Sequence, residues 1–448
     1  MRKFFEGHSF AGVAILLSVF LLAVFLRFTD LASQSPWTDE LASWWYLRHL
    51  GEIWGKESHS PLYYTLLRFF CGADADVPAL RSFSASVSVL HLIEFFFLGQ
   101  LVFDKKRFLI FWVLVCLCPV DIVYARMARH YAWLLEGLIV FILLYRLRVP
   151  VWLESLVAAF MGFIHVFAVI PISFLALYRF WKERRWSELL PVLVSANLVL
   201  VYYLLRLLSL GPQVVGSNVE WNSISLVNFW ASLVTQFLGD SYPRFVFYPV
   251  NPYLAALVVG ATSLWILYRR RESGLQYLGV FLVSLLAIEV FGFWLNLRVN
   301  RYLIYLVGFW IIAFTDSLGE VKLWQPLTLT GLLLGHILFQ NPVLSFPWDR
   351  EKVESWRNFT ARFPDSPQLT CASVYQSAYF DLRSPPDCIR ALKDVSLRKD
   401  LLYFDLNNTE KMVALFLTQN MNAEEYIPLK SGAIIRFSPK EDHGKSQR

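Results

Sequence analysis

Apolar runs of helical length dominate the chain, and short polar segments separate them. A helix that crosses a bilayer needs about 20 mostly apolar residues. Eleven runs approach that length, at 10–29, 80–101, 108–125, 131–147, 150–166, 167–181, 188–209, 252–268, 275–296, 302–317 and 324–341. The first is long for a signal peptide and no small-residue cleavage site follows it, so we interpret it as a retained anchor. The pattern predicts a mainly α, polytopic membrane protein with about eleven transmembrane helices.

Basic residues between the runs predict how the chain is oriented. If the N-terminus is cytoplasmic, the basic clusters all fall on the cytoplasmic side, as the positive-inside rule requires. These clusters are Lys105–Arg107, Arg146 with Arg148, Arg179–Arg185, Arg269–Arg271 and Lys322. Three longer segments, 30–79, 210–251 and 342–448, then lie outside. We therefore expect a multi-pass protein of the cytoplasmic (inner) membrane with an extracytoplasmic C-terminal domain.

Residues after 341 are more charged and richer in proline than the runs before them. Helical spacing of apolar residues marks 349–363, and 409–418 has the pattern of a second helix. Short strands are expected at 369–375, 401–406, 425–429 and 433–437. The chain is thus divided into a transmembrane domain, 1–341, with outer loops 30–79 and 210–251, and a small extracytoplasmic α/β domain, 342–448.

Composition narrows the class of protein further. Of 448 residues, 56% are hydrophobic, 17% aromatic and 17% charged, against about 25% charged in soluble domains. This excludes a soluble or a disordered chain. The net charge of +6 is spread over short clusters, which excludes a nucleic-acid binder. Neither a P-loop nor a dinucleotide fingerprint is present.

The five cysteines show no metal-type spacing. Cys116 and Cys118 lie in an apolar run and are expected to be packing residues, while Cys71 is isolated. Cys371 and Cys388 both fall in the predicted outer domain, where an oxidising compartment permits a disulfide. The sequence leaves that pairing open, because it does not show the geometry.

Two acidic segments follow the first run. Asp39 and Glu40 lie at the expected membrane rim among tryptophans, a position that suits a catalytic base. The alternative is that Thr38 or Asp39 caps a helix beginning near Leu41. Glu57 and His59 could orient a substrate or, with Asp39, hold a divalent metal. The alternative there is a polar loop before an interfacial helix that starts near a proline.

Arginines gather on the side predicted to be poor in positive charge. Arg126 and Arg129 fall in a tight turn between two runs, and Arg81, Arg244, Arg298 and Arg301 are further outer-rim arginines. Snorkelling to lipid headgroups explains one or two such residues. A site for a phosphate-bearing lipid explains the whole set, because guanidinium grips phosphate at two points.

Histidines in the runs have two interpretations. His165 is a substrate-binding candidate, although a lone histidine there is more often a packing residue. His91 and Glu94 share a helix face and are expected to pair with each other or with another helix, as buried membrane charges must.

Several segments together resemble the GT-C integral-membrane glycosyltransferases, most closely the branch of protein O-mannosyltransferases and lipid A aminoarabinose transferases. Trp37–Glu40 resembles the acidic motif of their first outer loop, and His59–Tyr64 is similar to a His-Pro-Pro-Leu-Tyr-Tyr stretch, with Ser60 at the first Pro. The remaining matches are Arg81, the 125–132 turn, Asn300–Leu303 and Glu354–Arg357. Met127 departs from the family's usual Glu, and Glu57 stands where Asp is common.

The resemblance implies transfer of a sugar from a polyprenyl-phosphate donor to a hydroxyl of a glycolipid, polysaccharide or protein at the outer face of the membrane. Asp39 would be the base and Glu40 would orient the acceptor. Arg126, Arg129 and Arg301 would bind the donor phosphate, and Tyr131 would donate a hydrogen bond to it. Glu57, His59, Arg81 and His165 are further substrate-binding candidates. No cofactor is certain, because arginines can replace a divalent metal. The alternatives are a lipid or solute transporter and a non-catalytic scaffold.

Overall fold

The structure, a computed structural model, describes residues 10–32, 38–56, 60–210, 251–269, 272–294, 306–319, 321–322 and 324–340, and three strands within 401–439. Two compact units are formed, one by residues 1–31 and 46–344 and the other by residues 32–45 and 345–448. Each is described by itself below. The predicted domain boundary at 341/342 stays a prediction.

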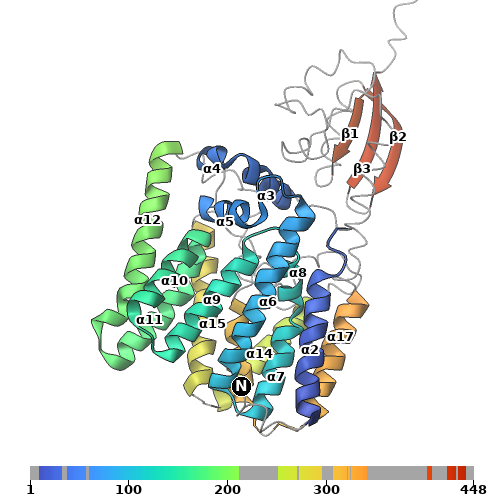
Figure 1. The fold of residues 1–448 in the computed structure, drawn as a ribbon. Coiled ribbons are helices and arrows are strands. Elements are labelled where there is room, and N and C mark those ends of the chain that lie inside the picture. The colour runs from blue at the N-terminus through green and yellow to red at the C-terminus, as the bar shows by residue number, and fades with distance from the viewer. Residues whose placement is uncertain are drawn as a thin grey trace, which may run out of the picture. The chain divides into compact units, whose positions relative to one another are not determined.

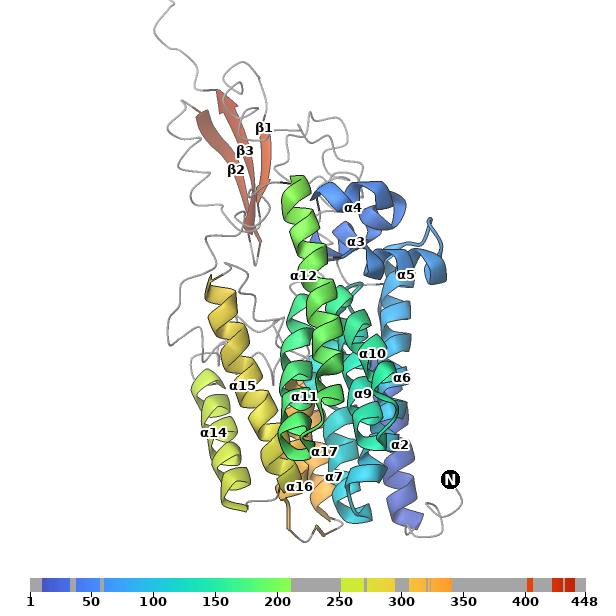
Figure 2. The same ribbon diagram turned by 90° about the vertical axis from the view of Figure 1, so that its left-hand side faces the viewer.

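The first unit is a bundle of helices, and the described part of the chain is mainly helical, as predicted. Its long helices run roughly parallel to one another in both views (Figures 1 and 2). Each of the eleven predicted runs contains a helix or a bent pair of helices. They are α2 (Phe10–Phe28), α6 (Val77–Val102), α7 (Lys105–Cys116), α8 (Pro119–Ala125), α9 (Tyr131–Leu147), α10 (Val151–Ile164), α11 (Val169–Glu183), α12 (Leu190–Leu210), α14 (Asn251–Arg269), α15 (Glu272–Trp294), α16 (Val307–Ser317) and α17 (Trp324–Gln340).

Two of the described helices, α2 and α6, are by themselves long and apolar enough to cross a membrane. A third span results if α7 and α8 are counted together, although the pair is bent by 44°. Apolar helices such as α10 and α16 are shorter, at 14 and 11 residues. The number of eleven spans therefore stays a prediction.

Polar side chains fix where several helices begin. The side chain of Asp76 accepts a hydrogen bond from Ala79 N at 2.9 Å and caps α6. Asp104 caps α7 in the same way through Lys106 N and Arg107 N. A capping side chain satisfies backbone N–H groups that have no partner inside the helix. Pro119 begins α8, and because proline has no N–H to continue the α7 ladder, the 108–125 run is bent.

Small residues allow close packing where aromatic rings are numerous. At Gly99 of α6, a Cβ atom would lie 2.6 Å from Phe111 Cδ1 and 2.8 Å from Phe108 Cδ2 of α7. Only hydrogen fits in that space, so this glycine sets the approach of α6 to α7. Cys116 and Cys118 are buried, which confirms that they are packing residues.

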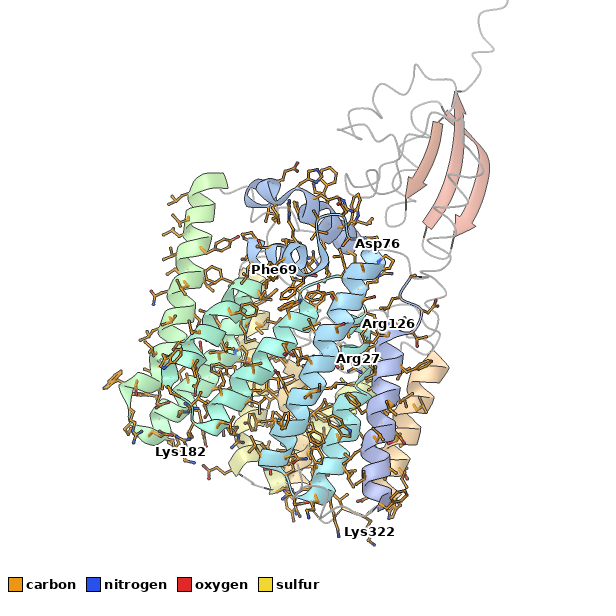
Figure 3. All side chains as sticks on the ribbon, viewed as in Figure 1. Arg27, Phe69, Asp76, Arg126, Lys182 and Lys322 are labelled. Carbon is orange, nitrogen blue, oxygen red and sulfur yellow. The ribbon has the colours of Figure 1, made fainter. Side chains whose placement is uncertain are left out.

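The short helices α4 (Leu50–Lys56) and α5 (Pro61–Cys71) lie across one end of the bundle (Figure 1). Ser60 caps α5, accepting from Leu62 N at 3.2 Å, and Pro61 occupies the first turn. A helix starting at this proline was predicted. Figure 3 shows Phe69 and Asp76 at this end and Lys182 and Lys322 at the opposite end. The two lysines, which belong to the predicted cytoplasmic clusters, thus lie at the same end of the bundle, as the basic-residue pattern predicts. The compartment that each end faces stays a prediction.

A buried arginine holds α9, α10 and α11 together near the Lys182 end. Arg179 Nη1 donates to Glu154 Oε1 and Glu188 Oε2, both at 2.9 Å, and Arg179 Nη2 donates to Tyr145 O at 2.6 Å. Its guanidinium carbon lies 3.8 Å from the centroid of the Tyr145 ring. All three charged side chains are buried, so the charges compensate one another.

The second unit contains a three-stranded antiparallel sheet of order β1-β3-β2. Its strands are β1 (Leu401–Asp405), β2 (Met421–Leu429) and β3 (Gly432–Pro439), with a register shift between Ala423 and Glu425. They overlap three of the four expected strands. The other expected elements, 349–363, 369–375 and 409–418, lie outside the described residues, as do Cys371 and Cys388. The α/β domain as a whole stays a prediction.

Helix α3 (Thr38–Arg48) begins in the second unit. Its first residue is Thr38, so the expected start near Leu41 is wrong. Thr38 and Asp39 lie within the first turn of the helix. They therefore do not precede the helix, as a cap of a helix beginning near Leu41 would. The physical reason is that both residues accept helical backbone angles in a first turn, where acidic side chains are favoured by the helix dipole.

Candidate functional site

The predicted tight turn is found between α8 and α9, and it is buried along its whole length. Arg126 follows α8 as its C-cap, Tyr131 begins α9, and the intervening residues have little contact with solvent. Arg126 Nη1 donates to Leu26 O at 2.6 Å, near the end of α2. Arg129 Nη1 donates to the Tyr64 hydroxyl of α5 at 3.3 Å. The turn therefore joins elements from the start of the bundle to α5.

Arg81 of α6 is a third buried arginine in this region. Its Nη1 donates to Leu31 O at 2.9 Å, a few residues after the end of α2. Burial and then the charge of Arg81 lower the pKa of Arg126 to about 10, and the nearby Asp30 charge opposes this change. Arg126 remains cationic at neutral pH. Two guanidinium charges that repel each other in a buried place favour the binding of an anion.

Histidine and tyrosine rings pack around His130, the residue that follows Arg129. The rings of His130 and His165 stack with centroids 5.3 Å apart and an interplanar angle of 23°. The ring centroids of Tyr131 and His130 are 4.7 Å apart. The Tyr63 ring meets the His130 ring edge-on, with centroids 5.9 Å apart. His165 ends α10, and its Nδ1 accepts a hydrogen bond from Phe167 N at 3.3 Å.

We call Arg81, Arg126, Arg129, Tyr131 and His165 the basic cluster, since the structure brings all five into the α5 end of one helical unit. Figure 3 shows Arg126 on the Asp76 side of this unit. The three arginines are buried and donate to protein atoms. Snorkelling to headgroups is therefore the wrong explanation for them, because a snorkelling side chain carries its charge into water.

Other predicted site residues are not part of this cluster. Glu57, His59 and Arg301 lie outside the described residues, as does the side chain of Asp39. Glu40 is buried on α3 and belongs to the second unit. Among the described residues, no group of three His, Cys, Asp or Glu side chains could hold a metal ion. The predicted metal ligands Asp39, Glu57 and His59 fall outside that search.

A buried ionic network that was not predicted from the sequence joins α2, α6 and α8. Arg27 Nη2 pairs with Asp121 Oδ2, and His91 Nε2 lies 3.0 Å from the same oxygen. His91 thus pairs with another helix, one of the two predicted outcomes. Glu94 also faces another helix, since its carboxyl group lies close to that of Glu136 on α9. The signal available in the sequence was the single charge of the run 10–29, Arg27, and the single charge of the run 108–125, Asp121.

Comparisons with known proteins leave the family open. No protein-family model matches the chain, and no curated protein matches it. Three solved structures of the oligosaccharyltransferase of Archaeoglobus fulgidus are similar. The complex with Zn and sulfate is 12% identical, with a TM-score of 0.49 over 95% of this chain and 73% of the other.

The apo form is 13% identical, with a TM-score of 0.42 over 84% of this chain and 60% of the other. The complex of that enzyme, AglB, with an inhibitory peptide and a dolichol-phosphate is 12% identical, with a TM-score of 0.42 over 85% and 60%. This chain thus spans less than two thirds of the latter two. Similarity at this level carries no conclusion about the activity of this chain.

Proposed function

We propose that the protein is a membrane glycosyltransferase. In this proposal it moves a sugar from a polyprenyl-phosphate donor to a hydroxyl of a glycolipid, polysaccharide or protein acceptor. The reaction takes place on the outer face of the cytoplasmic membrane. The proposal rests on the residues of the basic cluster and on the sequence motifs. It also takes the protein to cross the membrane more often than the two or three membrane-capable helices alone require.

The observation that carries the proposal is the burial of three arginines with tyrosine hydroxyls at one end of an apolar bundle. Arg81, Arg126 and Arg129 come from α6 and from the α8–α9 turn. Each guanidinium has five N–H donors, so an arginine that anchors a helix end can donate to a phosphate as well. A buried place strengthens such a contact, because the effective dielectric constant is low.

The chemistry follows from where charge develops. The acceptor oxygen loses its proton to Asp39 and forms a bond to the anomeric carbon of the sugar. The bond from that carbon to the phosphate oxygen breaks, and its electron pair leaves with the polyprenyl phosphate. Arg126, Arg129 and Arg301 stabilise the growing charge on that phosphate, and the Tyr131 hydroxyl donates a hydrogen bond to it. Glu40 orients the acceptor.

The test is transfer of labelled sugar from polyprenyl-phosphate donors by the purified full chain in lipid nanodiscs. In cells, the natural product is identified separately, by mass spectrometry of the envelope glycolipids and glycoproteins of strains with and without the gene. We expect Arg129→Met to lower the transfer rate by about 100- to 1000-fold, the usual effect of losing one charge contact to a transition state. Asp39→Asn should nearly abolish transfer while the protein stays folded.

The outcomes separate the possible functions. Normal transfer by Asp39→Asn would refute the base, and normal transfer by Arg129→Met would refute the phosphate site. Donor-lipid binding and transbilayer movement by the wild type without any sugar transfer would refute the enzyme and support a transporter. Arg107→Met, at the opposite end of α7 from this cluster, is a control that should keep the wild-type rate.

A further inference from the structure

The buried network around Arg27 is the strongest polar feature of the described chain outside the basic cluster. Arg27 lies in the last turn of α2 and is fully buried. Its Nε donates to Ser88 Oγ at 2.7 Å, its Nη1 donates to Cys116 O at 3.1 Å, and its Nη2 pairs with Asp121. One side chain therefore holds α6, α7 and α8 to the end of α2.

The network is located at the bend between α7 and α8. Cys116 is the last residue of α7, and Asp121 lies in the first turn of α8. A proline at the start of α8 interrupts the helical ladder there, and freed carbonyl groups in apolar surroundings need a donor. Arg27 supplies one and also binds the carboxylate beyond the bend. The direction in which α8 leaves the bend thus depends on this guanidinium.

His91 completes the network from α6. Its Nε2 lies 3.0 Å from Asp121 Oδ2 and 3.3 Å from Ser88 Oγ. The Asp121 carboxylate is therefore held by side chains of two helices, α2 and α6, at the same time. A carboxylate with two such partners in a buried place has a fixed position.

Both ends of this arrangement lead to the basic cluster. The carbonyl of Leu26, adjacent to Arg27, accepts the Arg126 guanidinium, and the carbonyl of Leu31 accepts the Arg81 guanidinium. Arg126 also terminates α8, the helix whose start carries Asp121. Arg27 thus fixes the end of α2, near the carbonyls that bind Arg126 and Arg81. It also fixes the start of α8, the helix that Arg126 follows.

We propose that Arg27, Asp121 and His91 are positioning residues that set the place of Arg126 and Arg81 for binding a phosphate. This inference rests on the proposed function, since it assigns a role in donor binding to residues that do not touch the donor. A displacement of about 1 Å at a positioned group can lower a rate by about 100-fold. Arg27 is one residue from Leu26 and four residues from Leu31, whose carbonyls hold Arg126 and Arg81, so loss of the network is expected to displace these two arginines.

The experiment compares Arg27→Gln with Arg179→Gln. Both replace a buried arginine that has a buried carboxylate partner, but Arg179 lies at the Lys182 end of the bundle. For each purified protein we would measure thermal unfolding, kcat and KM for the polyprenyl-phosphate sugar, KM for the acceptor, and inhibition by farnesyl phosphate as a probe of the phosphate site.

We expect Arg27→Gln to lower kcat/KM for the donor by about 10- to 100-fold and to weaken inhibition by farnesyl phosphate, with no change in KM for the acceptor. Arg179→Gln should lose as much thermal stability but keep the wild-type constants. Asp121→Asn and His91→Gln should change the donor constants in the same direction as Arg27→Gln. Arg27→Lys, which keeps the charge, should recover part of the loss.

Failure of this inference is distinguishable from failure of the proposed function. If the wild type transfers no sugar, the proposed function fails. If the wild type transfers and Arg129→Met does not, but Arg27→Gln matches Arg179→Gln in every donor constant, the positioning role is refuted. If Arg27→Gln does not fold, the decision falls to Asp121→Asn and Arg27→Lys, and unchanged donor constants in both would overturn the proposal.

Discussion

Replacement of Arg179 by methionine tests whether the buried charges near the Lys182 end stabilise the bundle. Arg179 Nη1 binds both oxygens of Glu154, at 2.9 and 3.1 Å, and Glu188 at 2.9 Å. In Arg179→Met, two buried carboxylates lose the cation between them. Removal of one partner from a buried ion pair costs about 3–5 kcal/mol. We expect the free energy of unfolding to fall by that amount.

The measurement is an unfolding titration of the purified protein in detergent. Lys182→Met is a matched control on the same helix, because Lys182 pairs with Glu272 at side-chain exposures of 52% and 70%. Solvent screens that exposed pair, so no measurable change is expected. Adding Glu154→Gln and Glu188→Gln to Arg179→Met should restore part of the stability. If Arg179→Met unfolds no more easily than Lys182→Met, the assignment of stability to this buried cluster is wrong.

Two further predictions concern helix packing and capping. Gly99→Ala should lower the free energy of unfolding by about 1–3 kcal/mol, the usual cost of overpacking. At Gly279 an added Cβ atom would meet no atom within 4 Å, so Gly279→Ala should not lower the free energy of unfolding. Equal stability of the two variants would contradict the packing argument. Partial burial raises the pKa of Asp104, but hydrogen bonds from Arg107 and Lys106 and the Arg107 charge outweigh this and hold the pKa below its ordinary value. Asp104 therefore stabilises the fold at neutral pH, and the difference in unfolding free energy from Asp104→Asn should be lost as the pH falls through the lowered pKa of the folded state; a difference that persists in stronger acid would refute this.

Most helices of the bundle could be predicted because their signals are local. An apolar run of sufficient length with a capping residue such as Asp76 or Asp104 specifies a helix without knowledge of its neighbours. The bend at Pro119 was not predicted, although the proline was visible. A proline within a membrane helix is compatible with a straight or a bent course, and the Arg27 donor that accompanies the bend comes from another helix.

The site could be predicted only in part for the same reason. Arg126 and Arg129 were found because positive charge is unusual in a turn that is predicted to lie outside. Their partners Leu26 and Tyr64 could not be inferred, since these contacts join residues 100 and 65 positions apart and depend on how the helices pack. The pairing of Arg27 with Asp121 was hidden in the same way, because each is a single charge among apolar neighbours.

The separation of Arg27 and Asp121 along the chain has a consequence for biosynthesis. The two charges are 94 positions apart, so the ribosome delivers α2 well before the carboxylate that neutralises its arginine. In the interval α2, which is long and apolar enough to cross a membrane, carries a cation without its carboxylate, and such a charge is costly at membrane depth. We therefore expect stable insertion of α2 to await the emergence of α8, and a truncated chain ending before Asp121 to be retained by the insertion machinery or degraded.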